Sequence, residues 1–177
     1  SPLSAYGLLL AAINDPDPVL FLEPKRIYRA IKQSVPNNGN ALPLDKAYVL
    51  KNGNDITLIS WGAMLQETLI AAEELEKKDI SAEVIDLATI KPIDTNTLLD
   101  SVATTGRAVI VHEAHKTGGV GAEIVALLNE YAFEDLKAPI LRVTGFDIVM
   151  PYFKMETYYL PSVKRILDAV YNTLEYA

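Results

Sequence analysis

The stretch that decides the fold is DITLISWGAMLQETLIAAEELEKK, residues 55–78, in which a short apolar run gives way to a helical pattern. Its first part is rich in β-branched residues and closes on Gly62, as a buried strand does. The second part places Leu65, Leu69 and Ala72 at the spacing of one helix face. A strand that leads directly into a helix indicates one unit of an α/β fold.

Strand and helix patterns keep alternating to the end of the chain. RAVIVHE at 107–113 is almost unbroken apolar sequence, which is typical of a strand covered on both faces. KAYVLKNG at 46–53 stands directly before the strand at 55–62 and predicts a hairpin arm, hence one antiparallel edge strand. Further strands are predicted at 81–87 and 139–145, and helices from Asp94 to Gly106, over 120–131, and from Pro161 to Leu174. We therefore expect an α/β fold with three α/β/α layers, whose mostly parallel five-stranded sheet has one antiparallel edge strand.

The first 44 residues do not follow this alternation of strands and helices. GLLLAAI at 7–13 predicts a short helix and VLFLE at 19–23 a strand. SVPNNGNALP at 34–43 has the composition of a linker. Because a lone helix and strand cannot make a core, we expect residues 1–30 to be the tail of a preceding domain. Residues 31–44 would be the linker and residues 45–177 the α/β domain.

Composition excludes several classes of function. No apolar run reaches the roughly 20 residues of a membrane span, so we expect no membrane partner. The chain has no cysteine, which excludes disulfides, thiolate nucleophiles and cysteine metal ligands. A net charge of −7 argues against nucleic acid and suits a basic protein partner.

Polar residues stand at the predicted carboxyl ends of the strands, where ligands gather in open parallel sheets. They are Ser60, Asp86, His112, Glu113 and Asp147. His112 and His115 with Glu113 between them raise the question of a metal site. Adjacent residues of a strand point to opposite faces, so His112 and Glu113 do not easily converge, and the chain has no third histidine. We do not expect a metal site here.

The glycines after the histidines admit two interpretations. Gly118, Gly119 and Gly121 precede a helix start, where free N–H groups favour a phosphate. The spacing GGVGAE matches neither the dinucleotide-binding nor the P-loop pattern, so the glycines more simply let a strand and a helix approach closely. Ser60 precedes Trp61 and Gly62 and does not stand in a nucleophile elbow.

Several segments, taken together and in order, carry a family resemblance. They are SPLSAYGLLLAAINDPDPVLFLEPKRIYR, LISWGAM, AEVIDLATIKPID, VHEAHKTGGVGAEI and APILRVTGFDIVMPYFKMETYYLPSVKRIL. Over essentially its whole length the chain resembles the β subunit of the E1 component of 2-oxo-acid dehydrogenase complexes, of the pyruvate and branched-chain types. The chain departs from the family at Ala88, where arginine is usual, which puts a local ion pair in doubt.

The resemblance implies a thiamine-pyrophosphate-dependent enzyme whose β subunit has a pyrimidine domain followed by a transketolase-like C-terminal domain. Residues 1–30 would be the end of the first domain and 45–177 the second. In the family the catalytic residues lie in the first domain, and the diphosphate and Mg²⁺ site lies on the α subunit. The resemblance therefore assigns no catalytic, cofactor-binding or metal residue to this chain, and we expect the chain alone to be inactive and to bind no cofactor.

The resemblance also implies partners and a compartment. The partners would be the E1 α subunit, a second β subunit and the basic subunit-binding domain of E2. Candidates for docking E2 are Glu156, Asp168, Glu175 and the terminal carboxylate. The compartment would be the cytoplasm, or the mitochondrial matrix in a eukaryote. Two alternatives stay open: another thiamine enzyme, such as transketolase or deoxyxylulose phosphate synthase, and a non-catalytic binding or assembly module.

Overall fold

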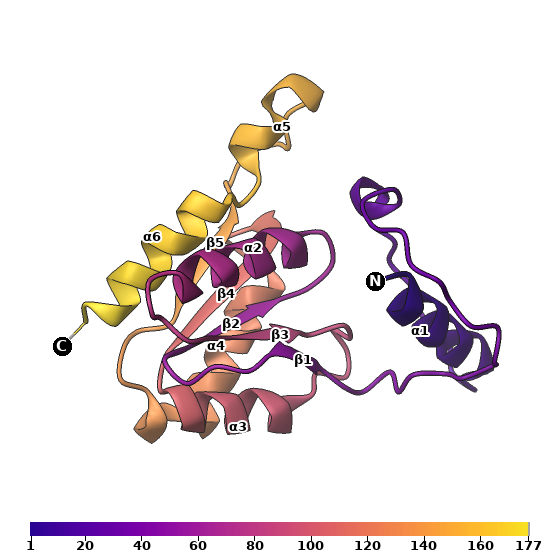
Figure 1. Ribbon diagram of the computed structural model, residues 1–177, viewed down its shortest axis with the longest axis horizontal. Coiled ribbons are helices and arrows are strands. Elements are labelled where there is room, and N and C mark those ends of the chain that lie inside the picture. The colour runs from indigo at the N-terminus through magenta and orange to yellow at the C-terminus, as the bar shows by residue number, and fades with distance from the viewer. Residues whose placement is uncertain (177) are drawn as a thin grey trace.

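The computed structural model describes residues 1–176, and strands and helices alternate along the chain as expected (Figure 1). The strands are β1 (Tyr48–Lys51), β2 (Ile56–Ser60), β3 (Ala82–Asp86), β4 (Ala108–His115) and β5 (Leu141–Gly145). The helices are α1 (Pro2–Asn14), α2 (Met64–Glu76), α3 (Thr95–Thr105), α4 (Val120–Tyr131), α5 (Phe153–Tyr159) and α6 (Val163–Leu174), with short 3-10 turns η1 (Lys25–Ile27) and η2 (Phe133–Asp135). Within the described residues, no helix has the length and apolar character to cross a membrane.

The five strands form a single sheet in the order β1-β3-β2-β4-β5. The pairs β2–β3, β2–β4 and β4–β5 are parallel, and only β1 runs antiparallel to its neighbour, β3. The predicted fold class is confirmed: the sheet is mostly parallel, five-stranded and bordered by one antiparallel edge strand.

The predicted hairpin between β1 and β2 is wrong, because β3 lies between these two strands. Both edges of β2 are occupied by parallel neighbours, which leaves β1 to pair on the far side of β3. The connection crosses the start of β3, where Asn54 and Asp55 donate their amides to the Ser81 carbonyl at 3.1 and 2.9 Å. Gly53 makes this crossing possible, since a Cβ there would lie 2.2 Å from the Ala82 carbonyl carbon.

Helices cover both faces of the sheet and create two cores (Figure 1). The helices α2 and α6 pack on one face with side chains such as Leu58 and Val109. On the other face α3 and α4 pack with Ile59 and Ile110. Successive residues of a strand thus serve opposite cores, which explains why β2 is buried along its entire length.

Local signals set the ends of the helices. The Asp94 carboxylate caps α3 by accepting the Thr97 amide at 3.3 Å, and Gly106 ends that helix in a left-handed conformation with φ 71°. Pro161, expected within the first turn of the last helix, lies just before it. Ser162 is the N-cap of α6, and its hydroxyl accepts the Arg165 amide at 3.3 Å.

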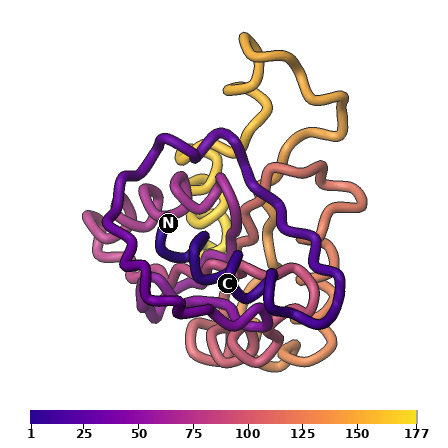
Figure 2. The backbone as a smooth tube through the Cα atoms, turned by 90° about the vertical axis from the view of Figure 1, so that its right-hand side faces the viewer, coloured from indigo at the N-terminus to yellow at the C-terminus, as the bar shows by residue number. Residues whose placement is uncertain are grey.

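The N-terminal segment (residues 1–44) lies at one side of the domain and crosses the near face in Figure 2. The expected helix is confirmed as α1, but residues 19–23 form no strand because no strand of the sheet pairs with them. Instead α1 packs on the linker, where the Leu42 amide donates to the Gly7 carbonyl at 2.9 Å. A Cβ at Gly7 would lie 2.6 Å from Leu42 Cγ, so glycine permits this close contact.

Residues 146–158, here called the arm, project away from the body at the top of Figures 1 and 2. Many of their large apolar side chains are exposed; Val149 is 90% and Tyr152 96% accessible. The base of the arm is fixed by Arg165, whose guanidinium donates to the Thr144 carbonyl at 2.6 Å and lies 4.6 Å from the centre of the Phe146 ring. The arm is therefore an apolar projection on a well-anchored base.

Candidate functional site

The carboxyl ends of β2, β3, β4 and β5 meet at one edge of the sheet, as their parallel register requires. Ser60 lies opposite Asp86 on one side and Val111 on the other, and Val111 lies opposite Val143. The structure therefore places the expected polar residues along a common edge. Whether they form a reactive centre depends on what each side chain contacts.

His112 is a packed side chain and does not face solvent. It is 1% exposed, and its ring stacks on the Trp61 indole with centroids 5.2 Å apart and planes inclined by 13°. Neither ring nitrogen has a hydrogen-bond partner. Burial, with a smaller contribution from Arg142, lowers the pKa of His112 to about 4. The imidazole is therefore neutral at pH 7. It packs between Trp61, which follows β2, and the glycines at the start of α4.

The glycines of the following loop make room for this ring. A Cβ on Gly121 would lie 2.4 Å from His112 Nε2, and a Cβ on Gly119 would lie 2.7 Å from His112 Cε1. Gly118 has φ 71°, a conformation that favours glycine. These distances support the structural interpretation of the glycine loop: the space in which the chain could cradle a phosphate is filled by the imidazole.

The polar groups beyond His112 tie two loops together. The Asp147 carboxylate accepts the Thr117 amide at 3.0 Å and the Thr117 hydroxyl at 2.7 Å, and these hydrogen bonds lower its pKa. His115 Nε2 lies 2.7 Å from the Ile148 carbonyl oxygen. The loop after β4 is thereby held against the start of the arm.

His112 and Glu113 diverge as the alternation of a strand requires. The first is buried, while Glu113 lies on the opposite face and is exposed. Nearby protein still raises the pKa of Glu113 by desolvation, an effect that Arg26 opposes and Glu156 and Glu67 reinforce. Among residues 1–176, no three His, Cys, Asp or Glu side chains are grouped so as to hold a metal ion.

Ser60 and Asp86 are likewise parts of the scaffold. Ser60 is fully buried and its hydroxyl has no partner. Burial raises the pKa of Asp86, whose carboxylate accepts the Ala88 amide at 3.0 Å. Ala88, the position at which arginine is usual in the family, adopts a left-handed φ of 51°. The Asp86 carboxylate thus stabilises the turn at Ala88, whose backbone conformation is strained.

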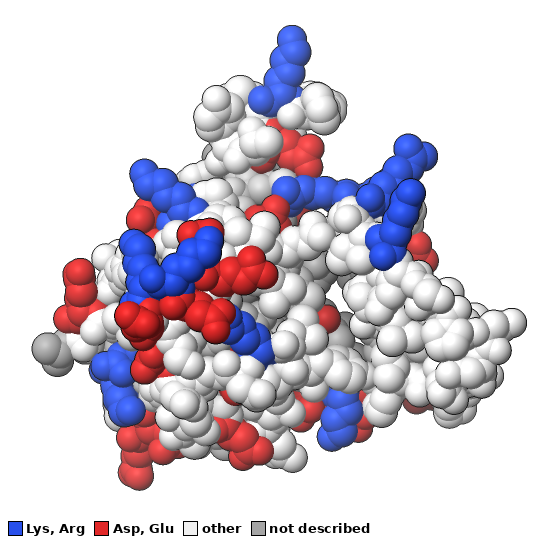
Figure 3. Space-filling view, viewed as in Figure 1, with Lys and Arg blue, Asp and Glu red and all other residues white. Residues whose placement is uncertain are grey.

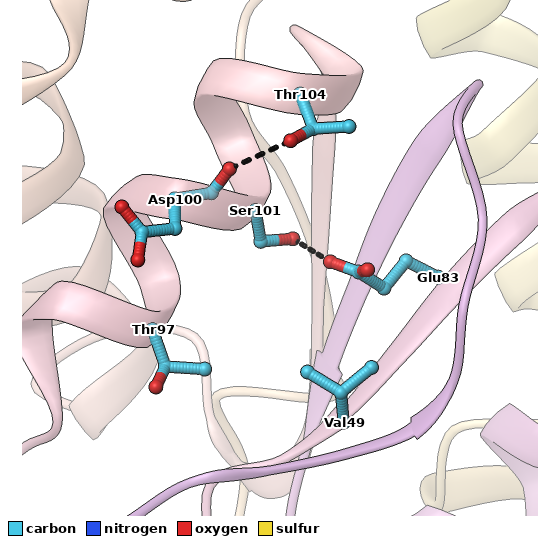
Figure 4. A pocket seen from close by; sticks show the side chains of 6 residues that line it. All are labelled: Val49, Glu83, Thr97, Asp100, Ser101 and Thr104. Carbon is cyan, nitrogen blue, oxygen red and sulfur yellow. Dashed lines mark hydrogen bonds between the residues drawn. The ribbon is translucent and has the colours of Figure 1, made fainter.

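A polar pocket of about 310 Å³ lies away from this edge, between α3 and the β1–β3 border (Figure 4). Its lining residues are Val49, Glu83, Thr97, Asp100, Ser101 and Thr104. Ser101 donates a hydrogen bond to Glu83 (Figure 4). The Ser101 hydroxyl also lies 2.6 Å from the buried Thr57 hydroxyl. Sequence reasoning did not identify this pocket, although hydroxyl residues inside otherwise apolar stretches were its signal.

The acidic residues proposed to dock E2 do not form one cluster. Glu156 lies on α5, within the arm, and is half-buried. Asp168 and Glu175 are exposed on α6 and just after it, seven residues apart and so on similar faces of that region. The terminal carboxylate belongs to residue 177, outside the described residues. Figure 3 shows acidic and basic side chains intermingled over the α/β domain and few charges over much of the N-terminal segment.

The fold and this edge define the class of protein. The chain belongs to the family whose sequence model is described as transketolase, C-terminal domain, and that model matches residues 45–166. The chain is also similar to a subunit of a larger enzyme. It is 49% identical over 175 residues, 99% of its own length, to the pyruvate dehydrogenase E1 component subunit beta of Staphylococcus epidermidis, of which it covers 54%.

Two further relatives carry the same description. The chain is 50% identical over 94% of its length to the Acholeplasma laidlawii subunit, covering 51% of that protein. It is 46% identical over 99% of its length to the Bacillus subtilis subunit, covering 54% of it. The chain thus spans about half the length of the curated relatives it matches. Among solved structures it is similar to a split-gene transketolase in an inactive β4 tetramer, with a TM-score of 0.68, 29% identity and coverage of 77% of this chain and 43% of that one.

Proposed function

We propose that this chain is the C-terminal part of the β subunit of a thiamine-pyrophosphate-dependent 2-oxo-acid dehydrogenase E1 component. In the assembled enzyme, pyruvate or a branched-chain 2-oxo acid would lose carbon dioxide, and its acyl group would pass to an oxidised lipoyl group of E2, which is reduced. The observation that carries the proposal is the similarity, over 94% or more of the chain, to pyruvate dehydrogenase β subunits.

The role of this chain in that reaction would be assembly. Thiamine pyrophosphate would supply the electron sink for decarboxylation when it is bound, and we propose that its site lies outside this chain. The glycine loop is filled by His112, and no three His, Cys, Asp or Glu side chains of residues 1–176 are grouped to hold a Mg²⁺ ion. We propose that cofactor and substrate are bound by the α subunit and by the pyrimidine domain of β, while this domain holds the α₂β₂ tetramer together.

The division of the chain is part of the same proposal. Residues 1–30 would complete a preceding pyrimidine domain, 31–44 would be the linker and 45–177 the C-terminal domain. The exposed apolar residues of the N-terminal segment support this division, since Ile13 is 70% and Leu20 84% accessible. Such side chains are expected to be covered by the domain to which they belong.

A chimera tests the proposal directly. The C-terminal domain of the Bacillus subtilis β subunit, a 46% identical relative, is replaced by residues 45–177 of this chain, and the chimera is expressed with the matching α subunit. We expect a tetramer that decarboxylates pyruvate with a kcat/KM within about tenfold of the parent. A correctly assembled tetramer without activity, or a chimera that never binds α, would contradict the proposal.

The transketolase alternative has weaker support from the comparisons. The similarity to a split-gene transketolase, at 29% identity, is weaker than the 46–50% identity to the pyruvate dehydrogenase subunits. Assembly of residues 45–177 with the remaining parts of that transketolase, but not with the Bacillus subtilis subunits, would favour the alternative.

Docking of E2 is a separate part of the proposal. Glu156, Asp168 and Glu175 would attract the basic subunit-binding domain of E2 through charge, which acts mainly on association and weakens with salt. Their replacement by glutamine or asparagine, measured by calorimetric titration of the tetramer with that domain, should weaken binding. Glu130→Gln on α4, on the other face of the sheet, is the matched control. Unchanged affinity in the triple variant would contradict this assignment.

A further inference from the structure

Residues 24–27 form a contact between the N-terminal segment and the carboxyl edge of the sheet. Their turn is closed by two backbone hydrogen bonds, from the Ile27 amide to the Pro24 carbonyl and from the Tyr28 amide to the Lys25 carbonyl, both of 3.2 Å. The Ile27 side chain packs against the core on the α2–α6 face. A Cβ on Gly62 would lie 3.9 Å from Pro24 Cγ, so the turn rests beside the end of β2.

Arg26 supplies the ionic part of this contact. Its Nη2 lies 2.6 Å from Glu67 Oε1 at the start of α2. The Glu67 side chain is only 17% exposed, and its other oxygen is buried without a hydrogen-bond partner. A half-buried carboxylate of this kind depends on its cation more than an exposed one does.

The same guanidinium also acts on the charge of a second carboxylate, that of Glu113. Glu113, at the end of β4, has its charge stabilised by Arg26 and opposed by Glu67 and by Glu156 of the arm. Arg26 thus pairs with an acid of α2 and also stabilises the charge of an acid of β4. The N-terminal segment supplies the cation and the α/β domain supplies the acids.

We propose that residues 24–27 are a clasp that fixes the N-terminal segment on the carboxyl edge of the sheet, with Arg26 as its ionic contact and Ile27 as its apolar one. The clasp sets the position of residues 1–23, and of any domain they belong to, relative to the α/β domain. This inference goes beyond the proposed function and does not depend on it, since it concerns a contact within one chain.

The absence of cysteine makes the clasp directly measurable. Cysteines introduced at Ile13 and Lys164, both exposed, would be the only sites for a pair of spin labels. Pulsed electron resonance on the labelled chain should give one narrow distance distribution. Both Arg26→Gln and Ile27→Asp should broaden it, whereas Arg29→Gln, three residues further along the same segment and exposed, should leave it unchanged.

A second readout isolates the ionic contact. Arg26→Gln should speed amide hydrogen exchange over residues 24–30 by about two- to fivefold, the range of a partly exposed ion pair, and should leave β2 and β4 unaffected. It should also raise the pKa of Glu113 in a carboxyl NMR titration. A broad distribution in the parent chain, or an Arg26→Gln variant with unchanged distances and exchange, would overturn the clasp whatever the chimera shows.

Discussion

The Trp61 indole and the His112 imidazole stack at the carboxyl edge of the sheet, 5.2 Å apart and within 13° of parallel. Trp61 follows β2 and His112 lies in β4, so the stack joins the ends of two central strands. Gly119 and Gly121, at the start of α4, lie so close to the imidazole that a Cβ on either would meet it. The carboxyl edge is where ligands bind in other α/β proteins, and here side chains fill the part of it next to these glycines.

Stability should fall as the pH is lowered, in part because of His112. The unfolded side chain takes up a proton near its ordinary pKa of 6.5, whereas the folded one does so only near a pKa of about 4. Between these pH values the unfolded state binds the extra proton, so the free energy of unfolding drops by about 1.4 kcal/mol per pH unit from this group. Chemical denaturation at pH 7 and pH 4.5 should show a smaller loss in His112→Phe. Equal losses in the two proteins would contradict a neutral buried imidazole.

Gly121→Ala should destabilise the fold. Its methyl group would lie 2.4 Å from His112 Nε2, and α4 would have to move away from the sheet. We expect a loss of about 1–3 kcal/mol in the free energy of unfolding by urea denaturation. Adding His112→Ala should recover part of that loss, because it removes the opposing atoms. If the losses in the free energy of unfolding of the two substitutions were fully additive, the methyl group introduced at Gly121 and the His112 ring would not be in contact.

Arg165→Met should loosen the base of the arm. The guanidinium donates to the Thr144 carbonyl at 2.6 Å and to the Tyr159 and Leu160 carbonyls at 3.4 Å each. Loss of these charged hydrogen bonds should cost about 1.5–3 kcal/mol and should speed amide exchange in α5. Lys164→Met, at the exposed neighbouring position, is the control. Equal stabilities of the two variants would argue against the anchor.

Thr57→Val should test the buried hydroxyl network behind the polar pocket. The Thr57 hydroxyl lies 2.6 Å from the Ser101 hydroxyl and 2.8 Å from that of Thr105. Valine keeps the shape but leaves these buried hydroxyls with fewer partners, so we expect a loss of about 1–3 kcal/mol. Thr104→Val, at an exposed position of the same helix, should change the melting temperature little. Equal effects of the two substitutions would contradict a stabilising network.

Much of the fold could be predicted because its signals are local. The apolar first half of β4, the acidic cap at Asp94 and Gly106 at the end of α3 are each signals that lie within the element they predict. The pairing of β1 was predicted wrongly because sequence adjacency favours a hairpin, and nothing local to residues 46–62 shows that β3 occupies the intervening position. VLFLE has a strand composition but no strand of the sheet beside it, so its sequence alone was misleading.

The edge of the sheet was predictable in position but not in character. Parallel order brings Ser60, Asp86 and His112 to one side, as expected. The imidazole stacks on Trp61 and occupies the space next to the glycines. Trp61 and His112 are far apart in the sequence, so no local pattern predicts this contact. The contact of Arg26 with Glu67 joins residues that are 41 positions apart. No local sequence pattern predicts such a contact.

The central claim is that this domain holds neighbours together while the reacting groups lie on other polypeptide. Its most direct test is a turnover assay of the isolated 177-residue chain with pyruvate, thiamine pyrophosphate, Mg²⁺ and an artificial electron acceptor. The chain alone should reduce no acceptor, while the chimeric tetramer, which contains residues 45–177, should do so at a rate within about tenfold of the parent enzyme. Sustained pyruvate-dependent reduction by the chain alone would contradict the account.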